Sequence, residues 1–242
     1  MKRLIPSIVK RYAFYFSDYE REINHEGIIF NLDIRHLIDR TFYINRKYEE
    51  ENFQDLVDII KNENSDYFFD VGACWGIYSL RLAKKFNNLN IKAIEPIKRN
   101  VNRINSSVDK NNFTNIQVLH TAVGDQNGII LLGSNSDWSP NYKINETNVE
   151  VTEQSSIKIL DDLFDLDNQK IVMKIDVEGF EFEALKGAKK ILTNNKCHLQ
   201  IEIRYENYDQ VEKQLNDFGY NNSTGVKPLI ANDYEDCIFK NY

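Results

Sequence analysis

Short apolar runs recur along the chain from residue 67 onward, and each is followed by a longer stretch in which apolar residues return every three or four positions. A short apolar run predicts a strand buried on both faces, and the longer spacing predicts a helix with one buried side. The predicted strands are 67–71, 91–94, 116–120, 171–175, 199–203 and 236–239, and the predicted helices are 77–86, 98–110, 180–192 and 208–218. This alternation is typical of a parallel sheet wrapped by crossover helices.

Two regions, 1–66 and 133–157, depart from this alternation. The first contains one predicted strand at 28–32 and one predicted helix at 52–61. The second is polar and lacks either periodicity, and so long a stretch inside a domain is usually a lid, a binding loop or a hairpin. Segment 2–16 mixes basic and apolar residues, so it could form a membrane-surface helix, a dimerisation helix or a helix packed on its own domain.

The length and composition fit one folded globular domain. A chain of 242 residues with 42% hydrophobic and 28% charged residues resembles neither a disordered chain nor a membrane protein. The net charge of −7 disfavours a nucleic-acid substrate. Pro6, Lys10 and Arg11 interrupt the apolar stretch that a secretion signal requires. The three cysteines lack paired or zinc-binding spacing, so we expect a cytoplasmic protein without a structural metal.

A glycine-containing turn follows the first of these strands, in the pattern Asp70-x-Gly72-x-x-x-Gly76. The two glycines allow a sharp turn and the close approach of a ligand. A dinucleotide-binding turn has a third glycine and a helix N-terminus directed at pyrophosphate. The turn therefore suits a ligand that carries a cationic sulfonium and no phosphate, although it could also be an ordinary strand-to-helix connection.

An acidic residue, Glu95, stands at the end of the next predicted strand and is followed by Pro96. A carboxylate in this place can accept hydrogen bonds from both ribose hydroxyls of an adenosine ligand. Pro96 is also suited to the first turn of the helix that follows. Both interpretations can hold together.

Four motifs in this order resemble the FkbM family of methyltransferases. They are Asp70-Val71-Gly72-Ala73, Glu95-Pro96, Ala122-Val123-Gly124-Asp125 and Lys174-Ile175-Asp176-Val177-Glu178-Gly179. The matching segments 160–163 and 185–188 extend the resemblance over about residues 45–240. One departure is Cys74, where the family usually has asparagine.

The resemblance implies a Rossmann-like, doubly wound, mostly parallel seven-stranded sheet of the class I methyltransferase type. It implies S-adenosylmethionine as cofactor, with residues 51–242 as the methyltransferase domain and 1–50 as an extension packed on the core. The cofactor-binding residues that it implies are Asp70, Gly72, Ala73, Trp75, Gly76, Glu95, Pro96, Ala122, Val123 and Asp176.

Asp176 is the first candidate for the catalytic base, since it ends a strand where a parallel sheet opens its ligand crevice. Glu178 is a second candidate. Both could instead cap the helix that follows and favour its dipole.

Glu202, a further catalytic candidate, ends the next strand, so it is expected near Asp176. The two carboxylates could bind Mg²⁺, or they could pair with Arg204 or Lys174 without a metal. His120 ends the third strand and could act as a base or be structural. In 133–157, Trp138 and Tyr142 could stack on an acceptor ring or pack on the core.

Three function classes remain open. The first is an O-methyltransferase for a hydroxyl of a sugar, a glycan or a related metabolite, which could act as a homodimer. The second is a non-catalytic adenosine-binding or scaffold domain. The third, an NAD(P)-dependent oxidoreductase, is disfavoured by the absent third glycine.

Overall fold

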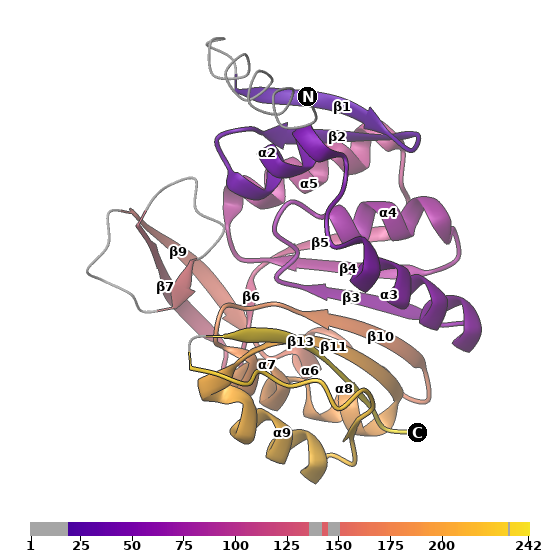
Figure 1. Ribbon diagram of the computed structural model, residues 1–242, viewed down its shortest axis with the longest axis vertical. Coiled ribbons are helices and arrows are strands. Elements are labelled where there is room, and N and C mark those ends of the chain that lie inside the picture. The colour runs from indigo at the N-terminus through magenta and orange to yellow at the C-terminus, as the bar shows by residue number, and fades with distance from the viewer. Residues whose placement is uncertain (1–18, 136–141, 145–150, 232) are drawn as a thin grey trace.

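The computed structural model describes residues 19–135, 142–144, 151–231 and 233–242. At the centre lies a seven-stranded sheet in the order β12-β13-β11-β10-β3-β4-β5 (Figure 1). Its strands are Asn221–Asn222 (β12), Tyr234–Lys240 (β13), Lys196–Arg204 (β11), Lys170–Ile175 (β10), Tyr67–Val71 (β3), Asn90–Glu95 (β4) and Ile116–His120 (β5). The six predicted strands are confirmed, each with its position in this sheet.

In this sheet the neighbouring strands β11, β10, β3, β4 and β5 run parallel, and only β13 and β12 pair antiparallel with their neighbours. The chain builds outward from β3 through β4 to β5 and then returns to place β10 on the other side of β3. The strand order therefore reverses between β3 and β10. In open α/β sheets the ligand crevice lies at such a reversal, outside the carboxyl ends of the strands.

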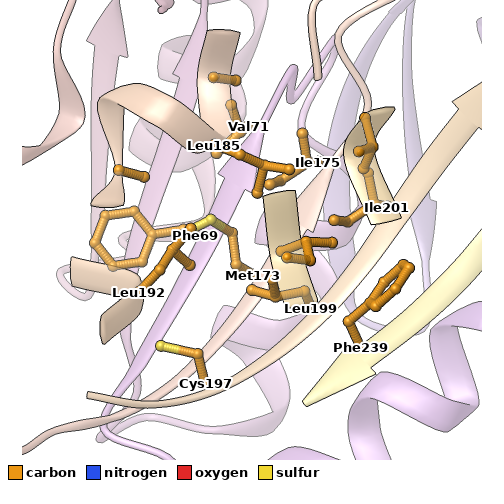
Figure 2. Packing of buried hydrophobic residues seen from close by; sticks show 14 of the residues in the cluster. Phe69, Val71, Met173, Ile175, Leu185, Leu192, Cys197, Leu199, Ile201 and Phe239 are labelled. Carbon is orange, nitrogen blue, oxygen red and sulfur yellow. The ribbon is translucent and has the colours of Figure 1, made fainter. Parts of the chain in front are cut away.

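Helices cover both faces of the sheet. One face carries three helices, Glu50–Glu63 (α3), Ile77–Lys85 (α4) and Lys98–Asn111 (α5). The other face carries Leu160–Leu163 (α6), Glu181–Gly187 (α7), Lys189–Asn194 (α8) and Tyr208–Asp217 (α9). A 3-10 turn, Tyr205–Asn207 (η1), precedes α9. Figure 2 shows the core under the second face, where Phe69, Met173 and Leu199 from adjacent strands lie together. The doubly wound fold predicted from the sequence is confirmed.

The single helix predicted at 180–192 is wrong, because the structure has two short helices, α7 and α8, separated at Ala188. Gly187 lies directly against Gly124 at this break. A Cβ on Gly187 would stand 1.9 Å from the Gly124 carbonyl oxygen. The apolar spacing that predicted one helix continues through both, since both face the same core.

The N-terminal part of the described chain forms a hairpin and a helix, Glu20–His25 (β1), Ile28–Asp33 (β2) and Leu37–Asn45 (α2). Strand β2 packs along α5, and the Asn111 side chain takes the place of a neighbouring strand: it accepts from Ile29 N at 2.8 Å and donates to Ile29 O at 2.7 Å. Of the elements in residues 19–66, only β2 and α3 were predicted. Segment 2–16 lies outside the described residues.

A second sheet of four strands has the order β6-β9-β7-β8 and projects beyond the central sheet (Figure 1). Its strands are Ala122–Val123 (β6), Val151–Lys158 (β9), Gly128–Ser134 (β7) and Lys143–Ile144 (β8). Strands β7 and β9 pair antiparallel, so of the three forms expected for 133–157 the described residues adopt the hairpin. Trp138 lies outside the described residues. In the part of the chain that the structure describes, no helix is long and apolar enough to cross a bilayer.

Candidate active site

A cavity opens at the carboxyl ends of β3, β4 and β10, where the strand order reverses. The side chains and backbone that line it come from the central sheet, from β6 to β8 and from the α2 region. They are Ile38, Tyr48, Val71, Gly72, Cys74, Ile94, Glu95, Pro96, Ile97, Asn100, Thr121, Ala122, Val123, Leu132, Tyr142, Ile144, Asp176, Val177, Glu178 and Phe180.

Gly72 and Asp176 meet at the floor of this cavity. The backbone N–H of Asp176 donates to Val71 O at 3.0 Å. Gly72 has a φ of +85°, and a Cβ there would lie 1.8 Å from the Asp176 carbonyl oxygen. Glycine is therefore required at this position both by the backbone conformation and by the neighbouring strand.

Glu95 is the most buried of the cavity's carboxylates, with 4% of its surface exposed. Its Oε2 accepts from Cys74 N at 2.8 Å, and its Oε1 accepts from Ile97 N at 2.9 Å and from Asn100 Nδ2 at 3.2 Å. Burial raises the pKa of Glu95 to about 7, and the three N–H donors limit that rise. Each carboxylate oxygen can accept two hydrogen bonds, so Oε2 keeps capacity for a ligand hydroxyl.

The other predicted residues of the glycine turn lie outside the cavity lining. Asp70 is buried and its Oδ2 accepts from the Ser79 hydroxyl at 2.6 Å and from Ser79 N at 3.2 Å, which ties β3 to α4. Trp75 packs edge-on against Phe30 in the core. Ala73 and Gly76 face α5, since Ala73 packs in the small cluster around Ile104 and a Cβ on Gly76 would stand 3.0 Å from the same side chain.

Asp176 forms an ion pair with Lys174, whose Nζ lies 2.8 Å from Asp176 Oδ2. Burial alone would lower the pKa of Lys174, but the carboxylates of Asp176 and Glu49 raise it well above its ordinary value. The ammonium therefore stays charged beneath the cavity.

Glu202 is a neighbour of Asp176, because the two residues follow the register partners Ile201 and Ile175 on adjacent parallel strands. Burial raises the pKa of Glu202 to about 8, and the Asp176 charge adds to the rise. Glu202 lies outside the cavity lining. Among the described residues, no group of three or more His, Cys, Asp or Glu side chains is arranged to hold a metal ion. The prediction of Mg²⁺ thus gains no support, and the ion pair with Lys174 matches the metal-free alternative.

Glu178 lines the cavity and pairs with Arg204, with Nη2 at 2.7 Å from Oε2. Burial and the Asp176 charge raise the pKa of Glu178. Helix α7 has Phe180 at its N-cap position and no side-chain capping hydrogen bond, so neither acid caps this helix. The capping alternative for Asp176 and Glu178 is therefore not what the structure shows.

His120 is not among the residues that line the cavity. Its Nε2 lies 3.0 Å from Pro96 O, and the residue is exposed beside the tip of β4. Tyr142, by contrast, lines the cavity and packs with Leu132 and Ile97. The structure thus brings Tyr142 to the site and leaves His120 outside the lining.

Among the lining residues that the sequence missed are Asn100 and two sets from outside the central sheet. Ile38 and Tyr48 come from the region of α2, and Leu132 and Ile144 come from the second sheet. Asn100 had a sequence signal, because it follows Glu95 by five positions and so lies in the first turn of α5. The others had none, since they reach the cavity only through the way that peripheral segments fold over the sheet edge.

The charge of the lining is one-sided. Its ionisable acids are Glu95, Asp176 and Glu178, and the described lining residues include no lysine, arginine or histidine. Lys174 and Arg204 pair with Asp176 and Glu178 from outside the lining, so the acids are partly compensated, and the described lining offers a pyrophosphate no basic side chain to bind it. The remaining wall is largely apolar, with Ile97, Ala122 and Phe180 available to a flat ring.

The structure shows the features that define the class I methyltransferase fold. They are a doubly wound seven-stranded sheet, an antiparallel strand beyond its parallel part, and a crevice beside the acidic end of β4. Solved structures share this fold. The methyltransferase FkbM from Methylobacillus flagellatus KT aligns with 73% of this chain at 20% identity and a TM-score of 0.51. This chain spans only 43% of that protein's length. The M. jannaschii TYW2, solved in complex with AdoMet, aligns over 94% of this chain and 89% of its own at 12% identity and a TM-score of 0.50.

The family model described as "Methyltransferase FkbM domain" matches residues 70–221. The chain therefore belongs to the FkbM methyltransferase family, as its motifs predicted. No curated protein matches the sequence significantly.

Proposed function

We propose that this methyltransferase takes its methyl group from S-adenosylmethionine and transfers it to a hydroxyl oxygen of a sugar, a glycan or a related small metabolite. The observation that carries the proposal is a cavity with three carboxylates and no basic side chain at the reversal of the strand order. A sulfonium cofactor without phosphate suits this wall, and a dinucleotide does not. The AdoMet bound to the TYW2 structure supports the choice of cofactor.

The residues present fit the parts of such a cofactor. Glu95 Oε2 would accept a hydrogen bond from a ribose hydroxyl, and the apolar wall of Ile97, Ala122 and Phe180 would hold the adenine. Asp176 and Glu178 would face the cationic methionine end. When bound, S-adenosylmethionine supplies an electrophilic methyl carbon on a charged sulfur.

Asp176 is the residue that we assign to the acceptor. Lys174 holds Oδ2 through its ion pair, and we infer that Oδ1 accepts a hydrogen bond from the acceptor hydroxyl and receives its proton. Alignment of donor and acceptor contributes about 7–11 kcal/mol in reactions of this kind, whereas a base adds about 10²–10⁴-fold in rate. The loss of the base is therefore expected to slow the reaction without abolishing it.

The reaction that we propose needs no divalent ion. Lys174 already places a positive charge beside Asp176, in the position where the sequence allowed Mg²⁺. Cys74, Cys197 and Cys237 are free thiols, which supports a cytoplasmic location.

The test is transfer of labelled methyl from S-adenosylmethionine to a panel of sugars, nucleotide sugars and glycans, with the product's methyl linkage read by mass spectrometry and NMR. We expect O-methyl product, full activity in EDTA, and a rate at least about tenfold lower in Asp176→Asn. Asp58→Asn, an exposed aspartate on α3, is the control and should be as active as the wild type. A methyl group on nitrogen or carbon, loss of activity in EDTA, or wild-type turnover by Asp176→Asn would each contradict the proposal.

A further inference from the structure

A chain of hydrogen bonds connects Glu95 to the N-terminal part of the molecule. Asn100 donates from Nδ2 to Glu95 Oε1 at 3.2 Å, and Arg103 donates from Nη2 to Asn100 Oδ1 at 2.8 Å. The other terminal nitrogen of Arg103, Nη1, donates to Asp39 Oδ2. Three side chains thus link the tip of β4 to helix α2.

All members of this chain are buried: Glu95 is 4% exposed, Asn100 and Arg103 are each 6% exposed, and Asp39 is 0% exposed. Asp39 also accepts from Asp33 N at 2.7 Å, and His36 Nδ1 lies 3.0 Å from Asp39 Oδ1. A buried charge is costly unless it is paired and hydrogen-bonded. Separating any of these buried polar side chains from its observed partner is therefore costly in free energy.

The series of hydrogen bonds also has a fixed donor-to-acceptor direction, which the side-chain amide of Asn100 sets. Because Arg103 donates to Asn100 Oδ1, the amide must present Nδ2 to Glu95. The reverse orientation would place an amide oxygen against a carboxylate oxygen and an amide N–H against a guanidinium. Asp39 holds one arm of the Arg103 fork, so it determines the position of the other arm.

The same segment forms part of the cavity itself. Ile38, which precedes Asp39 on α2, lines the cavity, and so does Tyr48, which follows the helix. The N-terminal segment therefore reaches the site both as a wall and through the buried hydrogen bonds.

We propose that Asp39 is a positioning residue for the cofactor: through Arg103 and Asn100 it holds the Glu95 carboxylate in the orientation in which Oε2 accepts from a ribose hydroxyl. The proposal rests on the proposed function, since it takes Glu95 as the ribose-binding group. It makes residues 33–48 a part of the cofactor site rather than an appendage to the domain.

The test is a double-mutant cycle of Asp39→Asn and Glu95→Gln, read as the affinity for S-adenosylhomocysteine by calorimetry. If Asp39 acts through Glu95, Asp39→Asn weakens binding about tenfold in the wild-type background and changes it little in the Glu95→Gln background. An equal loss in both backgrounds, or no loss in either, overturns this proposal while leaving the proposed function intact. A wild-type protein that binds no S-adenosylhomocysteine overturns both.

A second readout separates positioning from a general loss of structure. The wild type should prefer S-adenosylhomocysteine to its 2′-deoxy analogue, and this preference should shrink in Asp39→Asn. Phe42→Leu changes a fully buried residue of the same helix and should lower stability with the preference unchanged. Should Asp39→Asn fail to fold, Arg103→Lys takes its place, because a lysine keeps the charge and loses the fork; an unchanged preference in that variant contradicts the proposal.

Discussion

Gly72 shows how a single residue can determine both the fold and the site. It directly follows β3 in a left-handed conformation, and the carbonyl group of Asp176, which directly follows the adjacent strand β10, occupies the space beside it. The two strands that meet here are those between which the order of the sheet reverses. Any side chain at position 72 would therefore push β10 away from β3 and move Asp176.

Gly72→Ala is expected to lower the free energy of unfolding by at least about 3 kcal/mol, the sum of left-handed strain and overpacking against backbone. Gly219→Ala is the matched control, since Gly219 has a similar φ of +88° and no atom within 4 Å of a Cβ. That variant should lose only about 1 kcal/mol. Urea unfolding measures both, and equal losses would mean that the approach of Asp176 does not matter.

Elements were predictable from the sequence where burial dominated. Six strands of the central sheet are rich in apolar residues, because helices cover both faces of the sheet, and their predicted limits fell within three residues of the observed ones. Strand β12, which consists of two asparagines, was not predicted. Strand β9 escaped prediction because its sequence, from Val151 to Lys158, is mostly polar and its pairing with β7 depends on the hairpin. Strand β1 and helix α2 escaped prediction for a related reason, since both pack on β2, which itself packs on α5 and α4 rather than on the central sheet.

The hydrogen bonds that attach strand β2 to helix α5 can be tested by mutation. Asn111 bonds both backbone groups of Ile29, so Asn111→Ala leaves a part-buried N–H and C=O without these partners. We expect a loss of about 1–3 kcal/mol in the free energy of unfolding. Asn105→Ala, at an exposed position of the same helix, should be neutral or slightly stabilising because alanine favours helix. If both variants unfold at the same urea concentration, the Asn111 contacts do not hold the N-terminal hairpin.

For the whole molecule, the site combines segments that lie far apart in the sequence. The part at the strand tips was predictable: Gly72, Glu95 and Asp176 each end a parallel strand, and such ends gather at one edge of a sheet. The walls from α2 and from the second sheet were not, because no periodicity tells where a peripheral segment crosses that edge. Whether Asp176 and Glu202 would meet a metal or a lysine could not be read from their spacing either, and Lys174 supplies the charge.

The most direct test of the account is calorimetric titration of S-adenosylhomocysteine into the wild type and Glu95→Gln at pH 8 and at pH 6, with NAD as the comparison ligand. Burial raises the pKa of Glu95 to about 7, so at pH 6 the free protein holds mostly the neutral acid, and binding that needs the carboxylate must weaken as the pH falls. We predict that the wild type binds S-adenosylhomocysteine and not NAD, about tenfold more weakly at pH 6 than at pH 8. Glu95→Gln should bind at least about tenfold more weakly at pH 8, with little dependence on pH. A wild type that binds NAD instead, or a folded variant with wild-type affinity at both pH values, would contradict the account.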